Sequence, residues 1–369
     1  MIQTSSPLPR LTLALCLGLG LSLCACSGLH RPAPGPAPKP TPPPKQTQSQ
    51  FDAAKGGTPR NESEWGDAYY KKGDFRRAVA YLSEAVQKNQ GDPKLWRNLG
   101  SAYAMADDYD NAILCFQRAL KRNPADIKSL YNLSLVQGWK GSLPDAESAA
   151  KKGLTIQPAH AGLHSSLGNI LADENKEDEA LQEYATALKL NPKDPVTRFN
   201  LGGLRFKRRE LKDAEQAFGT VLQLAPGDVQ AAQNLAAVYI LQNRLTEAEK
   251  LNKWVVKQRP KDEDTLENAY FNLGIIYDRE NKLEPALNMY KLALQVAPWD
   301  AAAYVNTAVI LERLKRKSEA LAFWEKYQRL FPASRRADEI GKRVEILKKM
   351  VALEKATGKT KAKTKAKTE

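Results

Sequence analysis

Apolar residues return at helical spacing along most of the chain, from about residue 59 to residue 333. They stand at i, i+3, i+4 and i+7, which places them on one face of an α-helix. Proline interrupts the pattern at regular intervals, because its ring cannot continue a helix interior. The pattern therefore predicts a succession of short amphipathic helices arranged in pairs.

The pattern repeats with a period of 34 residues, and its clearest marker is Asn98-Leu99-Gly100. One interval is four residues longer, because an insertion within residues 261–268 adds about one helical turn. A fixed period of this size indicates one supersecondary unit stacked on copies of itself. The variants of the tripeptide begin at Glu64, Asn132, Ser166, Asn200, Asn234, Asn272 and Asn306.

Further positions mark each unit when Gly100 is counted as its position 8. Position 20 is alanine in all eight units, and position 32 is proline in seven. Small residues at positions 8 and 20 let two helices approach closely, and large side chains at positions 7 and 24 fill the space between them. The alanines are Ala78, Ala112, Ala146, Ala180, Ala214, Ala248, Ala286 and Ala320.

These marks resemble the tetratricopeptide-repeat pattern of Trp-x₂-Leu-Gly-x₂-Tyr, then Ala-x₃-Phe, then Pro. The resemblance covers about residues 59–333. It implies an all-α fold, a right-handed superhelical solenoid of eight helix-turn-helix units within residues 61–333.

A separate helix is predicted after the array, in residues 334–356. Ile340, Val344, Leu347 and Val351 would share one of its faces, and that face would cap the open end of the stack. Gly358 is expected to end this helix. Residues 357–369 are then expected to form a disordered, Lys-rich tail.

The N-terminus is interpreted as a targeting signal. Residues 11–23 are largely apolar but too short to span a bilayer as a helix, which fits the apolar region of a secretory signal. Leu23-Cys24-Ala25-Cys26 resembles a bacterial lipobox, which implies a lipoprotein signal peptide in residues 1–25 and lipidation of Cys26. Ser27, in place of the aspartate that retains lipoproteins in the inner membrane, implies the outer membrane. The alternative is an ordinary cleaved signal and a free periplasmic product.

Residues 26–60 are predicted to tether the folded body to the lipid anchor. Eight prolines between residues 32 and 44 favour an extended polyproline helix, and residues 46–60 are polar. A spacer that holds the body off the membrane is the first interpretation, and a proline-rich ligand for a recognition domain is the other.

The net charge bears on which kinds of partner the chain could bind. The formal charge is +14, and residues 342–369 supply half of it with ten Lys or Arg and three Glu. A basic excess can serve nucleic acid, an anionic membrane or an acidic polymer, or only solubility. Repeats of similar length can read RNA, but the order of Gly, Ala and Pro here and the export signal argue against nucleic acid.

Catalytic chemistry is scarce in the sequence. The three histidines, His30, His160 and His164, lie in no metal-binding motif, and neither a phosphate loop nor a nucleophile elbow is present. Cys115 stands alone in the body of the chain, where it is expected to be a buried apolar residue. The sequence therefore predicts a protein that is not an enzyme and that needs no cofactor or metal.

The resemblance implies a concave groove lined by the first helix of each unit, including its positions 2, 5, 6, 9 and 12. Position 6 is asparagine in six units, and an amide can both donate to and accept from the backbone of an extended peptide. The simpler explanation is that asparagine is common there in the family. The predicted amides, which resemble the asparagine ladder of O-linked GlcNAc transferases, are Asn98, Asn132, Asn200, Asn234, Asn272 and Asn306.

Other groove positions add aromatic and basic side chains. Tyr131, Phe199 and Phe271 stand at position 5, either as anchors for a partner or in packing between units. Lys94, Arg97 and Lys128 make the groove basic in units 2 and 3. These residues predict a protein partner, bound as an extended peptide or a helix.

Together the predictions describe a lipid-anchored, non-enzymatic scaffold on the periplasmic face of the outer membrane. By resemblance, its class is that of outer-membrane lipoproteins that assist secretin or type IV pilus assembly, or gliding machinery. The alternative is an envelope lipoprotein whose basic tail binds cell-wall or lipopolysaccharide anions.

Overall fold

The computed structural model describes residues 61–365 except residues 259 and 261. The predicted signal peptide, Cys26 and the tether lie outside these residues. The chain forms two compact units, whose described parts are residues 61–204 and residues 205–365. In the described residues there are helices and no strand, so the predicted all-α class is confirmed.

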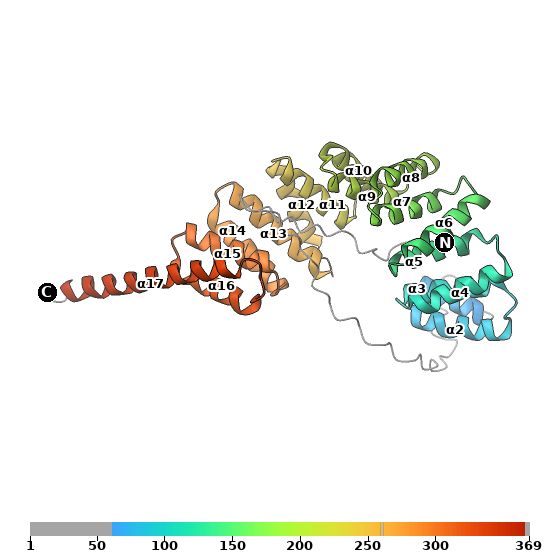
Figure 1. Cartoon of the computed structure of the whole chain (residues 1–369), viewed down its shortest axis with the longest axis horizontal. Helices are drawn as coiled ribbons and strands as arrows, with labels where there is room; N and C mark the ends of the chain where they lie inside the picture. Colours follow the sequence, from blue (N-terminus) through green and yellow to red (C-terminus); the bar gives the residue numbers. More distant parts are fainter. Residues whose placement is uncertain (1–60, 259, 261, 366–369) are drawn as a thin grey trace. The chain divides into compact units, whose positions relative to one another are not determined.

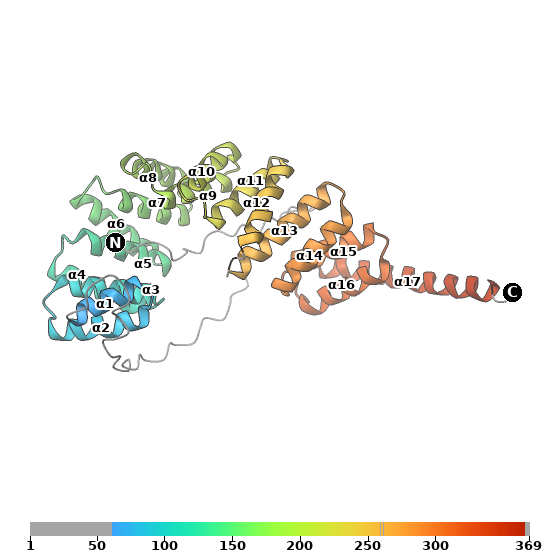
Figure 2. The same cartoon turned by 180° about the vertical axis from the view of Figure 1, so that it is seen from behind.

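The first unit consists of consecutive helical hairpins, and Figures 1 and 2 show its helices in sequence order from blue to green. Each helix packs against the next one along the chain. Asparagine or aspartate caps the N-termini of α1, α2, α3 and α4 through a side-chain oxygen. The helices are α1 (Glu62–Lys71), α2 (Phe75–Lys88), α3 (Pro93–Met105), α4 (Tyr109–Arg122), α5 (Ile127–Trp139), α6 (Leu143–Ile156), α7 (Ala161–Asp173) and α8 (Glu177–Leu190).

The second unit repeats the arrangement and ends in one longer helix. The boundary between the units falls inside α9 (Pro195–Lys207). Helix α13 has 17 residues, because the insertion extends its N-terminus by the predicted turn. The helices of this unit are α10 (Leu211–Leu224), α11 (Val229–Leu241), α12 (Leu245–Gln258), α13 (Glu263–Arg279), α14 (Leu283–Val296), α15 (Ala301–Arg313), α16 (Lys317–Leu330) and α17 (Ala337–Lys365).

One left-handed residue closes every hairpin at position 15 of its unit. Its positive φ ends the first helix and lets the chain turn back into the second. Only two of the eight residues are glycine, so the other six hold a conformation that costs an L-amino acid energy. They are Gly73, Asp107, Gly141, Asn175, Arg209, Asn243, Asn281 and Lys315.

The close helix approach predicted at position 8 is present. A Cβ added to Gly274 would lie 2.5 Å from the Cε1 atom of Tyr290, the position 24 side chain of the same hairpin. Gly100 stands in the same relation to Phe116, and Gly168 to Tyr184. Glycine is therefore required here because the aromatic ring occupies the space of its missing side chain.

Helix α17 packs on α16 through the predicted face. Ile340, Val344, Leu347 and Val351 are between 1% and 8% exposed. The predicted helix end at Gly358 is not observed, because α17 continues to Lys365. Lysine and alanine are good helix formers, and a single internal glycine costs only about 1 kcal/mol.

Candidate functional site

The candidate site is the surface that the first helices of the hairpins form within each unit, and these helices carry the predicted asparagines. We call Asn98, Asn132, Asn200, Asn234, Asn272 and Asn306 the amide row. Its members differ in exposure, since Asn132 and Asn272 are buried and the other four are half-buried.

In the first unit the amide row joins neighbouring hairpins. The Nδ2 atom of Asn98 donates to the Oδ1 of Asp67 at 3.1 Å, and that of Asn132 donates to the Oγ of Ser101 at 3.2 Å. Asn200 donates to the Oδ1 of Asn169 at 2.8 Å. Each acceptor lies 31 residues earlier, at position 9 of the preceding unit. These three amides therefore hydrogen-bond each hairpin to the preceding one, and we call them the fasteners.

In the unit where position 6 is Ser166, a hydrogen bond between two hydroxyls takes the place of the amide bond between hairpins. The Oγ atoms of Ser134 and Ser166 lie 2.8 Å apart, and both side chains are buried. The Oγ1 of Thr197 also lies within hydrogen-bond distance of the Oγ of Ser165, at 2.7 Å. Buried hydroxyls that satisfy one another in this way cost little in desolvation.

In the second unit the amides have different surroundings. Position 9 is apolar at Ala237, Ile275 and Val309, so these residues offer no side-chain acceptor. The Nδ2 of Asn272 instead lies 3.5 Å from the Oδ1 of the buried Asn252. Asn306 hydrogen-bonds to the hydroxyl of Tyr290, although burial still raises the pKa of that phenol.

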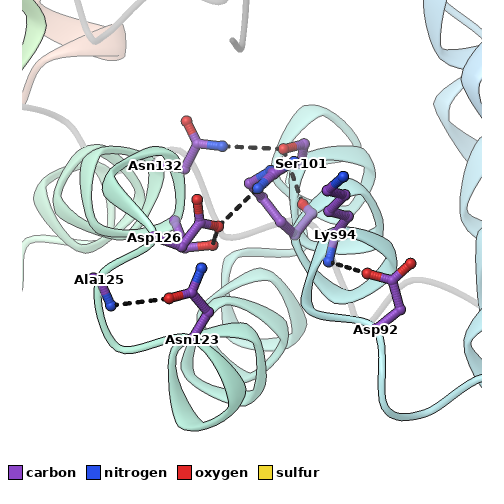
Figure 3. A network of polar contacts seen from close by, with 9 residues as sticks. Asp92, Lys94, Ser101, Asn123, Ala125, Asp126 and Asn132 are labelled. Atoms are coloured by element: carbon purple, nitrogen blue, oxygen red, sulfur yellow. Dashed lines mark hydrogen bonds and ion pairs between the residues drawn. The ribbon is translucent and has the colours of Figure 1, made fainter.

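Asn132 has one polar atom that remains unsatisfied. Its side chain is 2% exposed, and its Oδ1 has no hydrogen-bond partner among the described residues. Figure 3 shows the amide of Asn132 facing Ser101, with Asp126 and Lys94 nearby. A buried acceptor without a donor costs about 1–3 kcal/mol, so Asn132 lowers the stability of the fold at this point.

The predicted basic residues separate into one paired and two exposed side chains. The Nη1 of Arg97 lies 2.8 Å from the Oδ2 of Asp126, and both side chains are largely buried. The same carboxylate accepts from the Oγ of Ser129 at 2.7 Å, at the start of α5. Arg97 therefore stabilises the junction of α3 and α5, whereas Lys94 and Lys128 are exposed to solvent.

The predicted aromatic residues lie mostly in contacts between helices. The ring centroid of Tyr131 is 5.6 Å from that of His160, and burial raises the pKa of its phenol to about 12. Phe271 is 8% exposed and makes an edge contact with Tyr290, with centroids 5.5 Å apart. Phe199 is half-buried. The interpretation as packing between units thus describes Tyr131, whereas Phe271 packs within its own hairpin.

The histidines that sequence inspection singled out have local structural partners. The Nδ1 of His160 accepts from the backbone N–H of Leu163 at 3.0 Å, as the cap of α7. The two ring nitrogens of His164 lie 2.6 Å from Glu183 and 2.8 Å from the carbonyl of Pro158. Within residues 61–365 no group of three or more His, Cys, Asp or Glu is placed to hold a metal ion.

Sequence reasoning missed the acceptors at position 9 and a pair of carboxyl groups. Polar side chains at Asp67, Ser101 and Asn169, three residues after position 6, were the available signal for the acceptors. Burial, and then the charge of Asp300, raises the pKa of Glu267 to about 8, and the two groups share a hydrogen bond. Spacing alone could not find this pair, since it depends on burial.

Comparison with known families identifies the repeated hairpin. One family profile described as a tetratricopeptide repeat matches residues 63–127 and 271–335, and a second matches residues 205–266. A profile described as a TPR repeat matches residues 168–208. No curated protein sequence matches the chain.

Solved structures of similar fold come from proteins of low sequence identity. The APC/C hetero-tetramer Cut9-Hcn1 aligns with a TM-score of 0.58 and 14% identity over 80% of this chain, which spans 58% of the length of that chain. The pilF protein of Pseudomonas aeruginosa aligns with a TM-score of 0.51 and 20% identity, over 60% of this chain and 99% of its own. A tetratricopeptide repeat protein from Parabacteroides merdae aligns at 0.49 and 18%, over 70% and 99%. At these identities the similarity to the first two structures establishes the fold alone.

Proposed function

The chain belongs to the tetratricopeptide-repeat family, and we propose that it is a non-enzymatic scaffold that binds a protein partner on the first-helix surface of its hairpins. One observation carries the location of this site. The exposed Lys94 and Lys128 stand on the first helices α3 and α5, which the Asn132–Ser101 hydrogen bond joins.

The chemistry of this surface favours an extended, acidic segment of the partner. Asn98 is half-buried and bonds to Asp67 through its Nδ2, so its Oδ1 would be the acceptor for a backbone N–H of the partner. Lys94 and Lys128 would attract carboxylates without a fixed geometry, because an ammonium group is a mobile point charge. Arg97 would contribute indirectly, since Asp126 already pairs with it.

Site-specific photo-crosslinking in living cells tests the location. A photoreactive amino acid at Lys128, exposed on α5, should capture a discrete partner band. The same amino acid at Lys152, exposed on the second helix α6 of the same hairpin, is the matched control. Equal capture at both positions, or none at Lys128 in a folded protein, would refute a first-helix site.

Anchoring through Cys26 is a second part of the proposal and rests on the lipobox-like Leu23-Cys24-Ala25-Cys26. Several acyl chains on one cysteine bury enough CH₂ groups for stable attachment, at about 0.8 kcal/mol each. In the described residues, no helix is long and apolar enough to cross a bilayer. Cys26→Ala should therefore move the protein from the membrane to the soluble fraction, and unchanged fractionation would contradict lipidation.

We further propose that the anchored chain faces the periplasm from the outer membrane and aids assembly of an envelope machine. Ser27 and the lipobox support the address, and the class of machine is a type IV pilus, secretin or gliding apparatus. The fold shared with pilF is compatible with this class but carries no functional detail. Chemical crosslinking of whole envelopes followed by affinity purification should recover components of such a machine.

The alternative function is the binding of cell-wall or lipopolysaccharide anions by the basic C-terminus. Residues 342–369 carry a charge of +7, from ten Lys or Arg and three Glu. Deletion of residues 356–369 separates the two functions. The cellular phenotype survives this deletion if the scaffold carries the function, and it disappears if the tail does.

A further inference from the structure

Helix α17 has a second apolar face that points away from the array. Ile346, Met350 and Leu353 follow one another at i, i+4 and i+7, so they lie on one side of the helix. They are 52%, 40% and 66% exposed. We call these three residues the outer row. In the described part of the chain, every other helix carries at most one exposed large apolar side chain.

The cationic side chains of α17 divide between its two sides. Arg343 pairs with Glu312 of α15, and Lys348 lies 3.0 Å from Glu325 of α16, so both hold α17 on the array. Lys342 and Lys349 are exposed, and within residues 61–365 neither has an ion-pair partner. Lys342 precedes Ile346 by four residues and Lys349 follows it by three, which places both lysines beside the outer row.

We propose that the outer row, with Lys342 and Lys349, is a docking face for an anionic lipid surface. An amphipathic helix lies in the membrane interface when its apolar side chains enter the acyl boundary and its lysines stay among the headgroups. Residues 355–365 of the same helix contain five lysines and no acidic residue. The attraction of α17 to anionic headgroups therefore rises toward its C-terminal end.

Charge and shape favour lipid over other occupants. A second copy of α17 on the outer row would bring two lysine-rich helices together, and their charges would repel. An acidic protein partner would be recognised best in a groove or by arginine, but α17 is a single projecting helix (Figure 2). Eight of its nine cations are lysine, and a hydrated point charge suits a fluid surface of many phosphates.

This face is separate from the first-helix surface of the proposed function, so each proposal can fail alone. The test uses the full chain with vesicles of phosphatidylglycerol that carry a photoactivatable acyl chain. Peptide mapping after irradiation then locates lipid adducts along the sequence, which separates α17 from any attachment through the N-terminus. Adducts are expected on α17 around Ile346 and Met350.

Two double variants and their controls complete the experiment. Lys342→Gln with Lys349→Gln should lower α17 labelling by about 25-fold, at about fivefold per lysine near an anionic surface. Ile346→Ser with Met350→Ser should abolish it while the helical circular dichroism stays, because both side chains are exposed. Matched controls, which should label like the parent, are Lys250→Gln with Lys257→Gln on α12 and Val309→Ser on α15.

Three results would overturn the proposal. Equal α17 labelling by phosphatidylcholine vesicles would show that headgroup charge is irrelevant. Capture of a second copy, or of residues 1–60, by a photoreactive amino acid at Met350, with no lipid adducts on α17, would assign the outer row to protein. Unchanged labelling of both double variants would remove the named residues from the contact.

Discussion

Asn169 should contribute more to the stability of the first unit than an ordinary surface amide does, because its Oδ1 accepts hydrogen bonds from two hairpins at once. It accepts from the hydroxyl of Tyr184 at 2.8 Å and from the Nδ2 of Asn200 at 2.8 Å. Tyr184 is only 2% exposed. In Asn169→Ala the phenol of Tyr184 loses its acceptor. Because the phenol stays buried, water cannot replace the lost bond.

The expected loss in free energy of unfolding follows from the polar groups that lose a hydrogen-bond partner. An unsatisfied buried hydroxyl costs about 1–3 kcal/mol, and the lost bond to Asn200 costs about 1 kcal/mol. Alanine returns about 0.6 kcal/mol, because it is a better helix former than asparagine. The net loss in free energy of unfolding for Asn169→Ala is therefore about 1.5–3.5 kcal/mol. Tyr184→Phe alone should cost about 1 kcal/mol, since it removes the hydroxyl as well as the bond.

A double-mutant cycle in urea, read by circular dichroism and by hydrogen exchange of α8, measures the coupling. Asn169→Ala should cost about 1–3 kcal/mol less in a Tyr184→Phe background than in the parent, because no buried hydroxyl is then left unsatisfied. Gln182→Ala, at an exposed site on α8, is the control and should change stability by less than about 0.5 kcal/mol. Additive costs, equal within about 0.5 kcal/mol, would refute the shared acceptor.

Three further predictions concern the second unit. Gly274→Ala should cost about 1–3 kcal/mol in urea unfolding, because its Cβ would lie 2.5 Å from Tyr290; wild-type stability would contradict this overpacking. Lys315→Gly should raise the melting temperature, because φ of +61° costs a non-glycine residue about 1–2 kcal/mol and the entropy of glycine offsets only part of it; a lower value would contradict strain. Burial and Asp300 raise the native pKa of Glu267, so its contribution to stability is fully present below the unfolded pKa of 4.5 and is lost as pH rises to about 8. Glu267→Gln should therefore flatten the fall in melting temperature with pH over this range, and an unchanged fall would exclude this group.

The sequence predicts the hairpins well, because their marks are local and repeated. Gly100 with Phe116 and Gly274 with Tyr290 meet as the spacing of positions 8 and 24 requires. The extra turn of α13 follows from counting residues in the insertion. The end of α17 could not be predicted in the same way, since Gly358 is a weak signal that neighbouring helix formers override.

The sequence predicts where the residues of the candidate site lie but not what they contact. The period places the asparagines on the first helices, but it does not say what each amide meets. Asn98 and Asn272 read alike in sequence, yet one donates to Asp67 and the other lies beside the buried Asn252. That difference depends on the side chain at position 9 and on burial, which a single repeat pattern does not encode. A partner-contacting role for the amide row stays a prediction.

The fasteners of the first unit also restrict which hairpins can be duplicated. A hairpin that carries the donor at position 6 and an acceptor at position 9, as α3/α4 does with Asn98 and Ser101, can bond to a copy of itself. The hairpin α5/α6 carries the donor Asn132 but has Leu135 at position 9. A tandem copy of α5/α6 would therefore leave its new amide without that acceptor. Lengthening of the array by gene duplication is thus more readily tolerated at α3/α4 than at α5/α6.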